Sequence, residues 1–339
     1  RIGSDEEVRD IVMAMGETGA GIFQLAMERG GMQKMMGVYR SLGELSKKSG
    51  RPVTFGSLSR KKYPGQWKAL YEIIEEENQQ GARIWTQVHS REINSILSFE
   101  TATPFDNWDV WKEFRALPIE EQLHKLKTDP ALKQKLIDIA DKPYEGPEIV
   151  GAEARPPEWD MFYYMDKIRL PHPSVAEIGR ERGLSPAAAM IELAIENDFK
   201  AFFRQPLANE NQDDALALMK HPRSTVTFSD SGAHVSQIMD SSLQTHLLSH
   251  WVREREAFTL EEAVRMITYE TSTNWGFHDR GLLREGLTAD ITVFNPDTVE
   301  PRMPEVVNDL PSGSKRLKQY ADGMLATVVA GQVVLKENE

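Results

Sequence analysis

Short apolar segments alternate with longer amphipathic segments along the first part of the chain. The apolar segments lie at residues 20–26, 52–58 and 83–88, and they are rich in the β-branched and aromatic residues that are typical of buried strands. Between them, apolar residues recur at helical spacing, which predicts helices at about 4–18, 31–49 and 64–80. Helices that alternate with short strands, at about 30 residues per unit, predict a parallel sheet and suit a (β/α) barrel.

The alternation is interrupted at about residues 101–157. Polar helical segments and frequent Lys, Asp and Pro predict a helical insertion here, either a lid over the active face or a surface decoration. From residue 279 onward, Gly turns and a hairpin at Ala330-Gly331 predict a small β region without crossover helices. We therefore expect a partial barrel domain at 1–278 and a small β domain at 279–339.

Two predicted helices carry clear start signals. Thr259 and Glu262 have the spacing of a capping box, and Ser185 followed by Pro186 is typical of an N-cap and first helical position. These signals are local, so they predict where a helix begins but not what it packs against.

One predicted strand is followed by two residues whose side chains could take part in catalysis or metal binding. Residues 225–228 alternate β-branched and aromatic side chains, and the polar sequence 229–234 follows, with Asp230 and His234. Both side chains would lie past the carboxyl end of a strand, where parallel α/β folds carry their active sites. A carboxylate close to an imidazole can act as a general base, a metal ligand or both. An Asp in such a loop can equally cap the next helix.

Polar residues also follow the earlier predicted strands. Ser57 follows the second strand, and His89 and Arg91 follow the third. An imidazole at this place could bind a metal or a substrate carboxylate, or it could be a hydrogen-bonded structural residue. Arg91 could hold a substrate carboxylate in a bidentate pair, or pair with Glu92 at the surface.

Composition narrows the class of function. The 339 residues carry a formal net charge of −12, which disfavours a nucleic-acid partner. There is no Cys, so a metal site would need His, Asp, Glu or a modified Lys. Neither an apolar run of membrane-span length nor a signal peptide is visible. We expect a cytoplasmic protein that acts on a small molecule, without a membrane partner, and a homo-oligomer remains open.

Several segments in the last third of the chain, in this order, resemble the amidohydrolase superfamily, and specifically its D-aminoacylase (N-acyl-D-amino-acid deacylase) branch. The matching segments are 229–234, 259–265, 279–281, 285–294 and the Gly-containing tail around Gly331. The resemblance implies a metal-dependent (β/α)8 TIM barrel joined to a small β-sandwich that is built from both chain ends. In this chain, the first barrel strands would then precede Arg1.

The resemblance also implies an activity: hydrolysis of a C–N bond other than a peptide bond, in an N-acyl amino acid, with zinc or another divalent metal. Asp230 would take a proton from metal-activated water and pass it to the leaving amine. Arg91 and Ser57 would bind substrate. His89 and His234 would be metal ligands or oxyanion stabilisers, while the main metal ligands are expected before Arg1.

The chain departs from the family pattern at two expected His ligands. A His-x-Arg setting is replaced by residues 25–29, with Ala26 and no His, and Ser57 stands where a second His is expected. These departures leave open a metal-free, non-catalytic or regulatory barrel homologue. A cyclic-amide hydrolase of the hydantoinase or dihydroorotase type is a further alternative.

Overall fold

The computed structural model describes residues 4–26, 32–145, 154–235 and 241–337, and its fold is α/β. A parallel sheet has the strand order β1-β2-β3-β7. Its strands are β1 (Phe23–Leu25), β2 (Val53–Gly56), β3 (Ile84–Val88) and β7 (Ser224–Val226). Its helices are α1 (Asp5–Thr18), α2 (Met32–Ser49), α3 (Gln66–Gln79) and α9 (Gln212–Lys220). The predicted alternation in the first 100 residues is confirmed; within the described residues this sheet is open rather than closed.

A second sheet, which the alternating pattern did not predict, is antiparallel with the order β4-β6-β5. Its strands are β4 (Ile93–Leu97), β5 (Tyr163–Met165) and β6 (Phe202–Ala208). The chain thus turns back after β3 instead of entering another crossover helix. Polar residues in these strands, such as Asn94 and Gln205, are buried, so neither strand shows an apolar alternation that sequence reading could detect.

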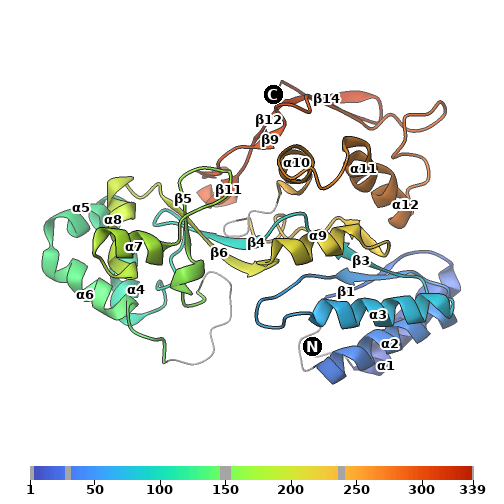
Figure 1. Ribbon diagram of the computed structural model, residues 1–339, viewed down its shortest axis with the longest axis horizontal. Coiled ribbons are helices and arrows are strands. Elements are labelled where there is room, and N and C mark those ends of the chain that lie inside the picture. Colours follow the sequence, from blue (N-terminus) through green and yellow to red (C-terminus); the bar gives the residue numbers. More distant parts are fainter. Residues whose placement is uncertain (1–3, 27–31, 146–153, 236–240, 338–339) are drawn as a thin grey trace.

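The antiparallel sheet packs with a group of helices in one apolar core (Figure 1). The helices are α4 (Asp109–Arg115), α5 (Ile119–Thr128), α6 (Pro130–Ala140), α7 (Val175–Arg182) and α8 (Pro186–Glu196), preceded by the 3-10 turn η1 (Trp159–Met161). Trp111 is fully buried there, and its Nε1 donates to the Leu136 carbonyl at 3.1 Å. Within the segment predicted as a helical insertion, residues 109–140 form helices, and they share this core with residues up to Phe203; residues 146–153 lie outside the described residues.

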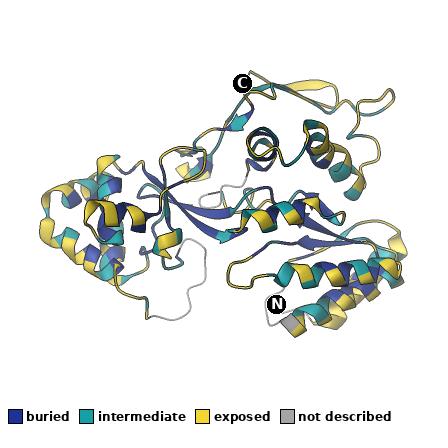
Figure 2. Cartoon of the chain, viewed as in Figure 1, coloured by how far each residue is buried: buried dark blue, intermediate teal, exposed yellow. Residues whose placement is uncertain are grey.

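The parallel sheet has its own core, shared with the helices that follow β7. These are α10 (Leu243–His246), the π-helix η2 (Leu247–Glu254), α11 (Leu260–Arg265), the π-helix η3 (Met266–Glu270) and α12 (Thr271–Asn274). Both sequence-level start signals are confirmed: Thr259 and Glu262 form a capping box, and Ser185 caps α8. Figure 2 shows buried residues concentrated in the strands of both sheets. Among the described residues, none of the helices combines the length and apolar character that crossing a membrane requires.

The C-terminal region contains short strands and one hairpin. One sheet has the order β14-β13-β8, and the pairs β9–β12 and β10–β11 are separate. The strands are β8 (Ile291–Phe294), β9 (Glu300–Pro301), β10 (Glu305–Val307), β11 (Arg316–Lys318), β12 (Ala321–Asp322), β13 (Met324–Val329) and β14 (Gln332–Lys336), with the 3-10 turn η4 (Pro311–Gly313). The predicted hairpin is confirmed, with Ala330 and Gly331 both at positive φ. Leu317 packs against the antiparallel sheet, and its amide donates to the Val235 carbonyl at 2.7 Å.

A buried polar network lies where the antiparallel sheet meets the loop after β3. Arg204 on β6 pairs with Glu92, and its guanidinium lies 4.2 Å from the centre of the Tyr163 ring. Its Nε donates to His172 Nδ1 at 2.8 Å, while His172 Nε2 lies 2.8 Å from the Lys167 carbonyl. His172 is therefore a neutral ring that accepts at Nδ1 and donates at Nε2. Burial, and then Arg204, lower its pKa to about 4. Burial also raises the pKa of Glu92, against the opposing effect of Arg204.

Helix α2 offers a matched pair of glycines as a packing test. A Cβ on Gly43 would lie 2.3 Å from Glu77 Oε2, and Glu77 is buried and paired with Lys47. A Cβ on Gly37 would meet nothing within 4 Å. We expect Gly43→Ala to lower the free energy of unfolding by about 1–3 kcal/mol. Gly37→Ala, the control, should raise it by about 0.5–1 kcal/mol. Urea unfolding measures both, and equal effects of the two substitutions would contradict this packing.

The His172 network predicts a pH dependence of stability. Because the folded-state pKa lies near 4, below the ordinary value of 6.5, the unfolded chain binds the proton more tightly between these values. This contribution to stability is present above pH 6.5 and is lost as the pH falls toward 4, by at most about 3 kcal/mol. His172→Asn should cost about 1 kcal/mol at pH 7.5, because the bond to Lys167 is lost. The difference in unfolding free energy between wild type and variant should then shrink, or change sign, at pH 4.5. Parallel profiles would show that His172 does not titrate in this way.

Candidate functional site

The candidate residues gather at the carboxyl edge of the parallel sheet. Strands β2, β3 and β7 run parallel, so the loops that follow them lie at one edge. The Ser57 amide donates to the Gln87 carbonyl at 2.9 Å, and the Phe228 amide donates to the Val88 carbonyl at 3.2 Å. Ser57, Phe228 and the residues after Val88 are thereby fixed to neighbouring strand ends.

Asp230 lies in a turn after β7. The amides of Ala233 and His234 donate to its backbone carbonyl at 3.0 and 2.9 Å, and its side chain is half-buried. The turn lies against the end of β2, because a Cβ on Gly56 would come within 2.6 Å of the Phe228 ring. Ser242, not Asp230, is the N-cap residue of α10, and residues 236–240, which follow the Asp230 turn, lie outside the described residues.

His89 is fully buried directly after β3. Its Nδ1 lies 3.1 Å from the Arg91 amide nitrogen and 3.2 Å from the Arg91 carbonyl oxygen. In either tautomer, Nδ1 is therefore engaged with the Arg91 backbone. Nδ1 is therefore not available to a metal or a substrate.

Arg91 is half-buried and held by neighbouring elements. Its Nη1 donates to Ser242 Oγ at 2.6 Å. The preceding Ser90 is attached to the helix after β7, because its Oγ donates to the Leu243 carbonyl at 2.7 Å and its own carbonyl accepts from Trp251 Nε1. Glu92 pairs with Arg204, and the nearby charge of Arg91 also opposes the rise in the pKa of Glu92.

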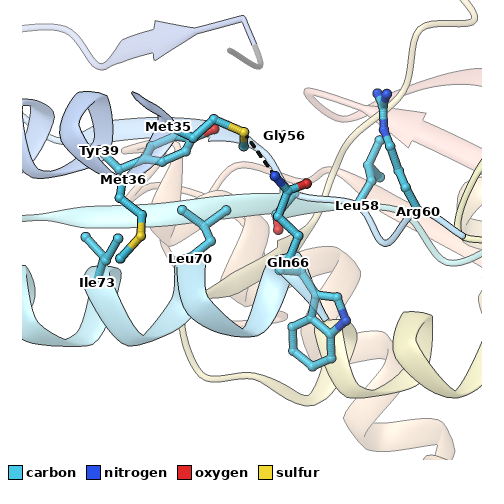
Figure 3. A pocket seen from close by; sticks show the side chains of 11 residues that line it. Met35, Met36, Tyr39, Gly56, Leu58, Arg60, Gln66, Leu70 and Ile73 are labelled. Atoms are coloured by element: carbon cyan, nitrogen blue, oxygen red, sulfur yellow. Dashed lines mark hydrogen bonds between the residues drawn. The ribbon is translucent and has the colours of Figure 1, made fainter. Parts of the chain in front are cut away.

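Ser57 lines a small cavity between α2 and α3, of about 40 Å³ (Figure 3). The cavity wall is mostly apolar. It includes Met35, Met36, Tyr39, Leu70 and Ile73, with Gln66 Nε2 donating to Met35 Sδ at 3.2 Å. Neither Asp230, His89 nor Arg91 lines this cavity, although Ser57 is bonded to the neighbouring end of β3.

A second cavity, of about 20 Å³, is polar and is lined by Arg91, Glu92, His172, Arg204 and His246, among others. Burial, followed by Arg91, lowers the pKa of His246 well below its ordinary value. Sequence reading missed Arg204, His172 and His246. The one available signal was an Arg within the otherwise apolar start of β6, which indicates a buried charge that needs a partner.

The described residues do not bring together a metal site. No three His, Asp or Glu side chains in that part of the chain are grouped so as to hold an ion. His234 is exposed, and Ala26 and Ser57 supply no ligand where the resemblance expects His. The remaining residues of the His-x-Arg setting, 27–29, lie outside the described residues. The described donors therefore do not fit a divalent ion by themselves.

Solved structures of an N-acyl-D-glutamate deacylase and a D-aminoacylase share the fold of this chain. The N-acyl-D-glutamate deacylase of Bordetella bronchiseptica, solved with zinc and a phosphonate inhibitor, aligns with a TM-score of 0.55 and 16% identity, over 99% of this chain and 57% of that chain. A D-aminoacylase structure described by its binuclear metal centre aligns with a TM-score of 0.55 and 17% identity, with the same coverage of each chain.

Two curated proteins of Alcaligenes xylosoxydans xylosoxydans are similar in sequence. Its N-acyl-D-aspartate deacylase is 31% identical over 117 residues, which is 34% of this chain and 20% of the relative. Its N-acyl-D-glutamate deacylase is 32% identical over 157 residues, which is 40% of this chain and 28% of the relative. The chain thus matches less than a third of the length of either relative. Both are of the D-aminoacylase kind that the sequence resembles.

A family model matches a continuous stretch from β5 to β14. The model of the amidohydrolase family covers residues 164–335, just over half of the 339-residue chain. This stretch contains the Asp230 turn and the helices after it. On this match, the chain belongs to the amidohydrolase family.

Proposed function

We propose that this chain is part of an enzyme that hydrolyses the amide C–N bond of an N-acyl amino acid. The similarity to N-acyl-D-aspartate and N-acyl-D-glutamate deacylases supports this reaction and favours an acidic D-amino acid in the substrate. The observation that carries the proposal is the half-buried Asp230 at the carboxyl edge of the parallel sheet, beside the strand end that bears His89 and Arg91.

Each candidate residue has a proposed task. Asp230 acts as a general base toward the attacking water and then donates the proton to the leaving amine. Arg91, whose backbone and guanidinium are both anchored, binds the substrate carboxylate. His89 and His234 act as oxyanion donors or metal ligands. Ser57 contacts substrate from the end of β2.

A divalent metal, zinc or another, supplies an activated water in this kind of chemistry. The solved D-aminoacylases described above hold zinc or a binuclear centre. In this chain His89 and His234 are the proposed ligands, and the described residues bring no third group to them.

The likeness to the solved deacylases supports a finer proposal on architecture. The parallel sheet would be one part of a TIM barrel, and the β14-β13-β8 sheet one part of a β-sandwich. The corresponding domains are 1–278, with the insertion at about 101–157, and 279–339. A cytoplasmic location is proposed from the absence of Cys.

A non-catalytic homologue is the second candidate function. Ala26 and Ser57 at the expected ligand positions favour it. Such a protein would keep the scaffold and bind no stoichiometric metal. Metal analysis of the purified intact protein, combined with the Asp230 variant below, separates it from the enzyme.

Replacing Asp230 tests the proposed general base. Asp230→Asn removes the proton-accepting group but keeps the side-chain size, so we expect kcat for N-acetyl-D-glutamate to fall by about 10²–10⁴ with a small change in KM. Asp138→Asn, on the exposed side of α6, is the matched control and should keep wild-type kinetics. An unchanged kcat in Asp230→Asn would remove Asp230 from the mechanism.

Replacing Arg91 tests the carboxylate clamp. Arg91→Met keeps much of the apolar stem and loses the charge, so KM for N-acetyl-D-glutamate should rise by about tenfold or more. The same reaction on the corresponding substrate with its α-carboxylate converted to a primary amide should change little, because the α-group that Arg91 is proposed to bind no longer carries a charge. An equal loss on both substrates would indicate that Arg91 has a structural role only.

A further inference from the structure

Asn209 directly follows β6, where the chain leaves the antiparallel sheet. It is fully buried, and its backbone has φ of +58°, in the left-handed region. Asn adopts this conformation more readily than other non-Gly residues. Nothing in the local sequence marked it, because Asn before α9 reads as an ordinary loop residue.

Three hydrogen bonds connect Asn209 to the loops after β2 and β3. Its side-chain Oδ1 accepts from the Ser59 backbone amide at 2.9 Å, and its backbone N–H donates to the Ser59 carbonyl at 2.8 Å. Its Nδ2 donates to the Arg91 carbonyl at 3.3 Å. One buried side chain therefore joins two strand ends of the parallel sheet to the end of the antiparallel sheet.

The bonds from Asn209 complete the anchoring of Arg91. The Arg91 amide is bound to His89 Nδ1, its guanidinium to Ser242, and its carbonyl to Asn209. Ser59 is also buried, so losing Asn209 would leave its amide without a partner and away from water. Water cannot easily replace a buried bond of this kind, and the two loops would gain freedom.

We infer that Asn209 is a positioning residue, which fixes the Arg91 carboxylate clamp and the Ser57–Ser59 segment relative to the Asp230 turn. The inference rests on the proposed function for its kinetic consequence only. The position needs an acceptor for Ser59, a donor for Arg91 and a left-handed backbone. Asn supplies all three, Asp lacks the donor, and Gly supplies the backbone alone.

Substitutions at Asn209 distinguish its two side-chain hydrogen bonds, the one accepted from the Ser59 amide and the one donated to the Arg91 carbonyl. Hydrogen exchange is measured by mass spectrometry on peptides covering residues 57–61 and 89–92, in the intact protein, with kcat and KM for N-acetyl-D-glutamate measured in parallel. In Asn209→Gly, exchange in both peptides should be faster by about tenfold. In Asn209→Asp, which keeps the acceptor, only the 89–92 peptide should be faster. KM should rise by about tenfold in both variants, with a smaller change in kcat.

Asn211→Gly is the matched control. Asn211 lies two residues later and caps α9, where its Oδ1 accepts from the amides of Asp213 and Asp214 at 2.9 and 3.3 Å. This variant should loosen residues 211–220 and leave both test peptides and KM unchanged. Wild-type exchange in the 57–61 peptide of Asn209→Gly would overturn the inference, as would equal effects of the control.

The kinetic measurements distinguish a failure of the proposed function from a failure of the inference about Asn209. A wild-type protein that hydrolyses no N-acyl amino acid would refute the proposed function. The exchange data would still decide whether Asn209 fixes the two loops. If exchange responds as expected but KM does not, Asn209 organises the loops without setting the substrate clamp, and the inference fails.

Discussion

The parallel pairing of β2, β3 and β7 is the constraint on which the candidate site depends. Parallel strands bring their carboxyl ends to one edge, so loops that are far apart in sequence meet there. Asp230 and Arg91 become neighbours of the same sheet edge through this pairing alone. Without this pairing, each would be an isolated polar residue in a loop, and an ordinary structural role would account for it.

The helical lobe is attached to this edge through buried polar groups. Between β3 and β7 the chain leaves the parallel sheet, builds a separate apolar core, and returns through β6. Arg204, Glu92 and His172 satisfy one another at the point of departure, and Asn209 closes the return. Buried charges and amides lose much free energy when unpaired, so these contacts fix one arrangement of the lobe against the loops.

The family match supports the proposed hydrolysis more fully than the residues at the site do. The amidohydrolase match covers the stretch with the Asp230 turn, and a carboxylate there suits proton transfer. Yet two positions where the resemblance expects imidazole hold Ala26 and Ser57, neither of which binds a divalent ion well. A scaffold can persist while a site changes, so activity has to be argued from the residues themselves.

The sequence alone determined the features that arise from short stretches of chain: the strands and helices up to the end of β3 at Val88, the capping box at Thr259 and the hairpin at Gly331. It also marked Asp230 as a candidate site residue, because a strand followed by small polar residues is a local pattern. Only the tertiary structure decided the antiparallel sheet, the partner of Arg204 and the role of Asn209. Asn209 bonds to Ser59 across 150 positions, and β4 carries buried polar residues whose partners lie on other strands. Periodicity records which side of an element faces the core, whereas a contact between distant residues depends on how the whole chain packs.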